Sequence, residues 1–199
     1  MGHKLIEALR YGTRVEHQQL DQLLLPVIRR IRTHKDYVDL LAIFYGFIKP
    51  MQDRIDLYLD DALVTAYSVR RRPGRLLNDI KALGGSAEPM ILCQRLPVIA
   101  HAGDALGAYY VLEGSTHGGS IISRMINENL QLTDEAGLSF FMGYGANNAN
   151  LWASFVESLE RSTADPDTAT IVESARKTFE CLKNWLTEGY GRKENKEAP

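Results

Sequence analysis

Helical spacing dominates this sequence, and the alternating pattern of β-strands is nearly absent. From Asp36 onward apolar residues recur about every 3.6 positions, which predicts a helix that Pro50 kinks or interrupts before it resumes toward Leu59. Further helices are predicted over residues 5–24, 72–83, 102–129, 147–161 and 167–188. Pro26 should end the first of them near Leu25. The sequence therefore predicts an all-α fold.

The chain length fits one domain. Its 199 residues are enough for a full hydrophobic core and few for two cores. No repeat period and no low-complexity block divides the sequence. We expect a single multi-helix bundle over residues 1–190, followed by a polar, frayed tail over residues 191–199.

Composition excludes several classes of protein. With 23 Lys plus Arg against 25 Asp plus Glu, the chain has no basic excess for nucleic-acid binding. The longest apolar runs, such as residues 23–27, are too short to span a bilayer, and residues 1–6 lack the apolar core of a signal peptide. We therefore expect a cytoplasmic protein. Cys93 and Cys181 lie far apart in sequence without a CxxC motif, which argues against a disulfide scaffold or a structural zinc site.

A line of polar residues follows one side of the first predicted helix. Arg10, Arg14, His17 and Asp21 are spaced by four, three and four positions, so they project from one side beside apolar neighbours. Such a line suits the rim of a pocket for a ligand that is anionic at one end and apolar elsewhere. In one interpretation it is an exposed surface network, worth well under ~1 kcal/mol per pair. In the other, His17 binds a metal or haem iron and Asp21 fixes its tautomer.

Glycines interrupt the helix predicted over residues 102–129. They are Gly107, Gly114, Gly118 and Gly119, and each costs roughly 1 kcal/mol relative to alanine inside a helix. Gly114 and Gly118 are one turn apart, so they open a notch where a flat ligand can approach bare backbone. The alternative is close packing against another helix through small residues. The polar residues Ser115, Thr116 and His117 beside the notch make a packing seam less favourable.

Two segments together resemble the haem oxygenase family. Residues 9–21 (LRYGTRVEHQQLD) are similar to its proximal helix, and residues 109–119 (YYVLEGSTHGG) are similar to its distal helix. The motif VLEGST-x-GG (residues 111–119) is most similar to the bacterial branch associated with bacteriophytochromes. Residues 140–145 and Trp152 also resemble that branch. The resemblance covers about residues 5–185 and implies the haem oxygenase fold.

The resemblance also implies roles for individual residues. His17 corresponds to the proximal iron ligand and Asp21 to the acidic residue that hydrogen-bonds its imidazole. Arg10, Arg14 and Tyr109 stand where the family contacts the haem propionates. On the distal side, Gly114 and Gly118 match glycines that face iron-bound oxygen, with Gly119 beside them. Ser115 replaces an aspartate of the best-studied branch, and the hydroxyls of Ser115 and Thr116 could hold distal waters instead.

Three further positions remain open at this stage. His117 either polarises a distal water network, binds the iron as a sixth ligand, or points outward into solvent. Lys177 and Lys183 are candidates for a propionate contact from the last helix. Neither could be aligned with the family pattern.

The resemblance implies that haem is both substrate and cofactor. The reaction would use O2 and external electrons to open the ring to biliverdin, CO and ferrous iron. Because no flavin or dinucleotide motif is present, the electrons would come from a separate reductase or ferredoxin. The resemblance to the bacterial branch also implies a bacteriophytochrome as the acceptor of biliverdin. The basic residues Arg70, Arg71, Arg72 and Arg75 could dock an acidic donor, or they could form a solvated loop.

Two alternatives belong to other functional classes. One is a haem carrier or sensor of the same fold without turnover. The other is a related all-α enzyme with a non-haem role, either di-iron or thiamine-degrading. A di-iron bundle needs Glu-x-x-His pairs, and none precedes His17, His34, His101 or His117. Neither cysteine has the setting of a thiaminase nucleophile.

Overall fold

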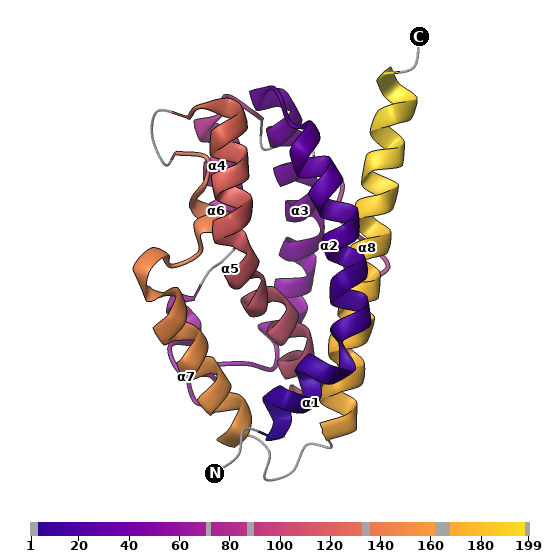
Figure 1. The fold of residues 1–199 in the computed structure, drawn as a ribbon. Helices are drawn as coiled ribbons and strands as arrows, with labels where there is room; N and C mark the ends of the chain where they lie inside the picture. Colours follow the sequence, from indigo (N-terminus) through magenta and orange to yellow (C-terminus); the bar gives the residue numbers. More distant parts are fainter. Residues whose placement is uncertain (1–3, 71–72, 87–89, 133–135, 162–167, 198–199) are drawn as a thin grey trace.

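The computed structural model describes residues 4–70, 73–86, 90–132, 136–161 and 168–197, with side chains through Arg192. Its helices are α1 (Lys4–Gly12), α2 (Arg14–Arg30), α3 (His34–Ile55), α4 (Gly74–Ala82), α5 (Ala102–Leu130), α6 (Ser139–Met142), α7 (Asn148–Arg161) and α8 (Thr168–Glu197), with short 3-10 turns at Tyr67–Val69 and Gly145–Asn147. These residues contain no strand, so the predicted all-α fold is confirmed (Figure 1).

Helix α5 lies at the centre of the bundle. α8 packs along it on one side, and α3, α6 and α7 pack around the rest. The backbones of α5 and α8 approach closely because Gly107 has no side chain: a Cβ there would lie 2.2 Å from the carbonyl oxygen of Ile171. Ser174 on α8 donates a hydrogen bond to the carbonyl of Asp104 at 2.7 Å, which fixes the register of the two helices.

Local signals in the sequence explain where several helices begin. Thr33 and Asp36 form a reciprocal capping box at the start of α3. His101 caps α5, because its Nδ1 accepts the backbone N–H of Asp104 at 3.3 Å. The buried Asp79 of α4 accepts the backbone N–H groups of Ser139 and Phe140 at 3.1 and 2.8 Å, and thereby anchors α6.

The first predicted helix is two helices in the structure. The break falls at Thr13, whose hydroxyl donates to the carbonyl of Leu9 at 2.7 Å. Gly12 beside it has no room for a side chain, since a Cβ there would lie 2.4 Å from Cγ1 of Val172. The expectation that Pro26 ends the helix is wrong: α2 continues to Arg30. A proline removes one intrahelical hydrogen bond, and burial of Ile28 (1% exposed) keeps the last turn in place.

Two other predicted boundaries also differ. α3 passes through Pro50 without interruption and ends at Ile55, before Leu59. α8 continues to Glu197, so the helix extends beyond the predicted boundary at residue 190. The guanidinium of Arg192 lies 4.8 Å from the ring centroid of Trp185 and 3.8 Å from the Glu188 carboxylate, and both contacts support the added turn.

Candidate functional site

Helices α2 and α5 run in the same direction and are joined near both ends. At one end Tyr110 of α5 lies close enough to Thr13 for the hydroxyl of Thr13 to act on that of Tyr110, and at the other Asn129 donates to the carbonyl of Ile28 at 3.2 Å. Between these contacts α2 rises about 22 Å and α5 about 28 Å along their axes. The longer path of α5 includes a bend near its middle (Figure 1). The two helices therefore enclose a stretch in which α5 bows away from α2.

His17 lies in this stretch, at the level of the notch on α5. It follows Thr13 by one helical turn, just as Gly114 follows Tyr110 by one turn. Its side chain is 59% exposed, and its Nδ1 lies 3.1 Å from Oδ2 of Asp21. Nε2 has no hydrogen-bond partner among the described residues, and the ring meets Phe179 of α8 edge-on at 5.5 Å. This leaves Nε2 available to a metal while Asp21 holds the other nitrogen.

The four glycines of α5 divide into two pairs. A Cβ at Gly118 would meet nothing within 4 Å, and a Cβ at Gly114 would meet only the Trp152 indole at 3.6 Å. These two glycines are not required for packing, which agrees with an open notch. At Gly107 and Gly119 a Cβ would instead lie 2.2 and 2.0 Å from a backbone carbonyl oxygen. The packing alternative thus describes Gly107 and Gly119, whereas Gly114 and Gly118 form the open notch.

Tyr109, expected at a haem propionate, is buried in the core, and its neighbour Tyr110 is the tyrosine of α5 beside Thr13. Tyr109 is 2% exposed and points into the core, where its hydroxyl lies 3.3 Å from Glu113. Burial, with the Glu113 charge adding, raises the pKa of Tyr109 well above its usual range. Tyr110 packs on Trp152 at 5.9 Å between ring centroids. Its position one turn before Gly114 was a signal in the sequence that could have identified it.

Arg10 and Arg14 are exposed, and neither forms a salt bridge within the part of the chain that the structure describes. Arg10 lies close enough to Tyr110 and His117 for its charge to act on both. Burial raises the pKa of Tyr110, whereas its hydrogen bond with Thr13 and the charge of Arg10 oppose that rise. Two guanidinium groups without a carboxylate partner in the described ranges, at the end of α1 and the start of α2, suit an anionic ligand group.

His117 does not simply extend into solvent. Its ring meets the Trp152 indole edge-on at 4.7 Å between centroids, beside Gly114. Desolvation, followed by the charge of Arg10, lowers the pKa of His117, and Glu113 one turn earlier opposes this. The imidazole is therefore favoured in its neutral form.

The hydroxyls next to the notch are used within α5. Ser115 is exposed, and its Oγ donates to the carbonyl of Leu112 at 2.7 Å. Thr116 is 1% exposed, and its Oγ1 donates to the carbonyl of Glu113 at 2.8 Å. The Thr116 side chain faces Gly143, so the expectation that it holds distal water is wrong.

The described basic residues that the sequence suggested for docking or propionate binding form contacts within the protein. Arg70 is 2% exposed and Arg75 donates to the carbonyl of Gly143, so neither belongs to an exposed docking cluster or a solvated loop. Arg71 and Arg72 lie outside the described residues. Lys177 pairs with Glu173 at 3.6 Å, and Lys183 reaches Oε1 of Gln19 on α2 at 2.6 Å.

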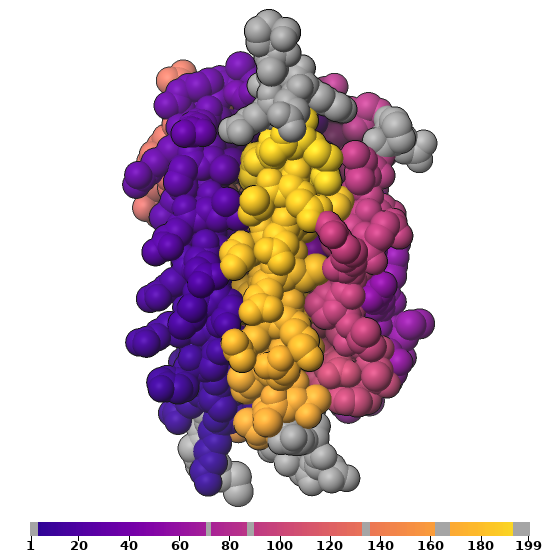
Figure 2. Space-filling view, turned by 90° about the vertical axis from the view of Figure 1, so that its right-hand side faces the viewer, coloured from indigo at the N-terminus to yellow at the C-terminus, as the bar shows by residue number. Residues whose placement is uncertain are grey.

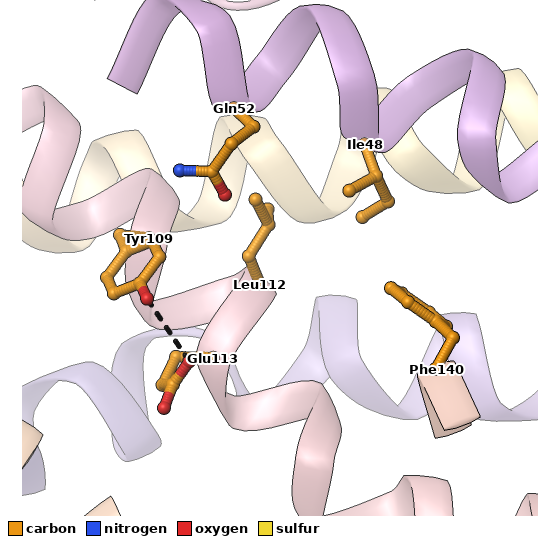
Figure 3. Close-up of a pocket in the computed structure, with 6 residues that line it drawn as sticks. All are labelled: Ile48, Gln52, Tyr109, Leu112, Glu113 and Phe140. Atoms are coloured by element: carbon orange, nitrogen blue, oxygen red, sulfur yellow. Dashed lines mark hydrogen bonds between the residues drawn. The ribbon is translucent and has the colours of Figure 1, made fainter. Parts of the chain in front are cut away.

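Two cavities lie away from His17 and Gly118. One, of about 10 Å³, is enclosed beneath α5 by Ile48, Gln52, Tyr109, Leu112, Glu113 and Phe140 (Figure 3). That volume corresponds to about one water molecule, so it belongs to the core. The other, of about 900 Å³, is a groove between residues 91–97 and α8. Figure 2 shows α8 between α2 and that segment. Of the residues predicted above to contact haem, the groove contains only Lys177.

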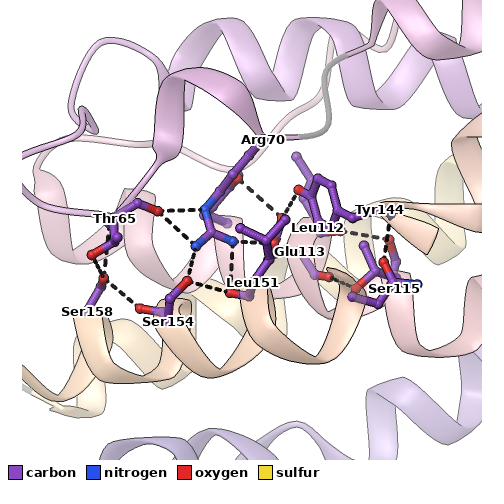
Figure 4. A network of polar contacts seen from close by, with 12 residues as sticks. Thr65, Arg70, Leu112, Glu113, Ser115, Tyr144, Leu151, Ser154 and Ser158 are labelled. Atoms are coloured by element: carbon purple, nitrogen blue, oxygen red, sulfur yellow. Dashed lines mark hydrogen bonds and ion pairs between the residues drawn. The ribbon is translucent and has the colours of Figure 1, made fainter. Parts of the chain in front are cut away.

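Sequence reasoning missed a buried polar network on the opposite side of α5. Arg70 and Glu113 form an ion pair with side chains 0% and 2% exposed. The hydroxyl of Tyr109 donates to the other oxygen of Glu113 at 3.3 Å (Figure 3), and the hydroxyl of Tyr144 donates to the same oxygen at 2.9 Å (Figure 4). Glu113 directly precedes Gly114, so the network is attached to the helix at the notch.

Within the described residues, no group of three or more His, Cys, Asp or Glu side chains could hold a metal ion. A metal at His17 would thus depend on a single protein ligand, as it does when the remaining ligands belong to a porphyrin. None of the helices in the described residues is long and apolar enough to cross a membrane.

Both the sequence and the fold are similar to those of known proteins. The Heme oxygenase family matches residues 3–188. The fold is similar to that of the NO- and CO-bound haem oxygenase from Neisseria meningitidis, with a TM-score of 0.78 and 23% identity over 94% of this chain and 92% of that one. It is also similar to haem oxygenase from Leptospira interrogans, with a TM-score of 0.73 and 18% identity over 92% of this chain and 98% of that one. No curated protein matches the sequence.

A family match over nearly the whole chain establishes the class: this protein belongs to the haem oxygenase family. It is accordingly an enzyme of haem degradation to biliverdin, with haem as its ligand and oxygen as its co-substrate.

Proposed function

We propose that haem binds between α2 and α5, with its iron on Nε2 of His17 and its distal face toward Gly114 and Gly118. One observation carries this assignment. The imidazole of His17 has one nitrogen held by Asp21 at 3.1 Å and the other without a protein partner, level with a glycine notch that no side chain fills. That donor arrangement fits a neutral proximal imidazole.

The other residues around the proposed haem site each have a physical role. Bound haem supplies the iron centre that activates oxygen. Asp21 accepts the Nδ1–H of His17 and keeps its tautomer and ring orientation. Gly118, with no atom near its Cβ position, leaves room above the haem plane, and Gly114 exposes backbone beside it. Arg10 and Arg14 supply the positive charge that pairs with the propionates.

The distal side carries polar groups that can hold a proton. We assign Ser115 to this side because it is exposed next to Gly114, and its oxygen can still accept a hydrogen bond while it donates to Leu112. His117 stands at the same end, and its lowered pKa favours a neutral ring that can both donate and accept. The hydrophobic contact of His117 with Trp152 supports a role in shielding this end from water.

The electrons come, in this proposal, from a separate reductase or ferredoxin, because the sequence has no flavin or dinucleotide motif of its own. The VLEGST-x-GG motif supports assignment to the bacterial branch associated with bacteriophytochromes. A bacteriophytochrome would then be the acceptor of biliverdin, and the enzyme would work in the cytoplasm.

Hemin titration of the purified protein tests the site. We expect a saturable Soret band at one hemin per chain, and at least a tenfold loss of affinity in His17→Ala. His34→Ala is the matched control, because His34 is an exposed helix residue at the start of α3. Addition of an electron donor under air should then convert the band to that of biliverdin. The assignment is wrong if His17→Ala binds hemin as the wild type does, and a stable band without conversion would indicate a carrier or sensor.

A further inference from the structure

The Arg70–Glu113 ion pair contacts the two helices that border the notch, α5 and α7. Glu113 directly precedes Gly114 on α5. Nη1 of Arg70 also donates to the carbonyl of Leu151 at 3.1 Å, and Leu151 directly precedes Trp152 on α7. Trp152 in turn is the residue whose indole lies over Gly114 and against His117. A single guanidinium thus binds the carboxylate of the residue before Gly114 and the backbone carbonyl of the residue before Trp152.

The hydrogen bonding of Arg70 is complete. Besides Glu113 and Leu151, its Nε and Nη2 donate to the carbonyl of Thr65 at 3.1 and 2.9 Å, and Nη2 donates to Oγ of Ser154 at 2.9 Å. A guanidinium has five N–H groups in a fixed plane, and five contacts use them all. Figure 4 shows this fan of contacts between α5, α7 and the segment around Thr65. Such a planar centre fixes direction as well as distance.

We propose that Arg70 and Glu113 are positioning residues for haem binding: they set where Trp152 lies over Gly114, and so the width of the distal space above the notch. This rests on the proposed function for the identity of the ligand, but not for the position of Trp152. The pair touches neither His17 nor the open face of Gly118, so it acts through α5 and α7.

The arrangement is more specific than stability alone requires. Replacing a buried ion pair by apolar residues of similar volume is often neutral for stability, so the pair is not needed to fill the core. Here the two charges join three segments that the hydrophobic core already packs: Phe155 of α7 meets Tyr109 of α5 at 5.4 Å between ring centroids. The added contribution of the ion pair is orientation of α7 relative to α5 beside Gly114.

The test uses NMR of the ligand-free protein, in which the chain has two tryptophan indole N–H resonances, from Trp152 and Trp185. Loss of a resonance in Trp152→Phe assigns them. We expect Glu113→Gln to shift the Trp152 resonance and leave that of Trp185 in place. Ser158→Ala is the matched control, since it removes a buried hydroxyl on the same helix α7 that is bonded to Thr65 rather than to Arg70. It should lower stability without moving the Trp152 resonance.

A second variant covers the case in which Glu113→Gln does not fold. In Arg70→Met/Glu113→Leu both buried charges are absent, so we expect the variant to fold. The Trp152 resonance should still be displaced, because the contacts to Leu151 and Ser154 are gone. Hemin affinity should fall about tenfold in both network variants, with the Soret maximum displaced, and stay within twofold of wild type in Ser158→Ala.

An unchanged Trp152 resonance in both network variants would overturn the positioning role. So would a displacement equally large in Ser158→Ala, since that would reduce the effect to general loss of stability. If the wild type itself bound no hemin, the proposed function would fail, and the indole measurement would still decide whether Arg70 and Glu113 position Trp152.

Discussion

Replacement of two adjacent glycines of α5 by alanine should change the stability of the protein in opposite directions. Gly118 and Gly119 share the same helix, and neither has a positive φ. Alanine is favoured over glycine in a helix by about 1 kcal/mol. At Gly118 nothing opposes this gain, because a Cβ would meet no atom within 4 Å. We expect Gly118→Ala to stabilise the ligand-free protein by up to about 1 kcal/mol.

At Gly119 the same methyl group would lie 2.0 Å from the carbonyl oxygen of Phe141. Reaching an ordinary contact requires a displacement of about 1.4 Å between α5 and α6. Phe141 cannot yield easily: its ring packs on Phe44 and Tyr37, and the backbone N–H of Phe140 is bonded to the buried Asp79. Overpacking a core typically costs about 1–3 kcal/mol. Because backbone must move, we place the net loss for Gly119→Ala at about 2 kcal/mol after the helix gain.

Thermal unfolding followed by circular dichroism is the assay. For a chain of this size about 1 kcal/mol corresponds to roughly 2–4 °C. The expected result is a Tm raised by about 2–4 °C in Gly118→Ala and lowered by about 4–8 °C in Gly119→Ala. Gly118→Ala should nevertheless weaken hemin binding, since its methyl group enters the notch. Equal Tm values for the two variants would refute the division of the glycines into notch and packing pairs.

Two further predictions concern titratable groups. Burial and the neighbouring Cys93 thiol raise the pKa of Cys181 to about 12, so at pH 8 iodoacetamide should alkylate Cys181 about 10³-fold more slowly than an ordinary thiol. Cys93→Ala should accelerate this alkylation, and a wild-type protein that reacts as fast as an ordinary thiol would contradict the prediction. Because the pKa of His117 is lowered, the folded state binds fewer protons than the unfolded state at pH values between that pKa and about 6.5. As the pH falls from 7 to 5, the wild type should therefore lose more stability than His117→Gln, by well under ~1 kcal/mol at this exposed side chain. An equal shift of the urea unfolding midpoint in the two proteins would refute this.

The sequence predicted the parts of the fold and site that depend on regular spacing. The spacing of apolar residues located the helices that became α5 and α7 to within one or two residues. The one-turn interval between Gly114 and Gly118, and between His17 and Asp21, places each pair on one face of a helix whatever surrounds it. These two intervals account for the correct part of the site geometry.

The sequence could not predict which face of a helix is buried against which neighbour. Tyr109 and Tyr110 are chemically identical and 100° apart around α5, so only the position of Thr13 and Glu113 decides which of them reaches α2. Gly118 and Gly119 differ in the same way. Arg70 stands in a run of arginines that is typical of an exposed loop, and its burial depends on Glu113, 43 residues further along the chain. Such long-range partners leave no local pattern.

The two halves of α5 should differ in local unfolding free energy. The first half is packed against α8 at Gly107 and held by Glu113, whereas the second carries an open glycine at Gly118 and is tied to α2 at Asn129. Amide hydrogen exchange should therefore be slowest before residue 114 and faster in the turns that follow, where opening does not require the whole bundle to unfold. With this gradient, we expect a large planar molecule to enter and leave beside the second half of α5 while the first half stays folded.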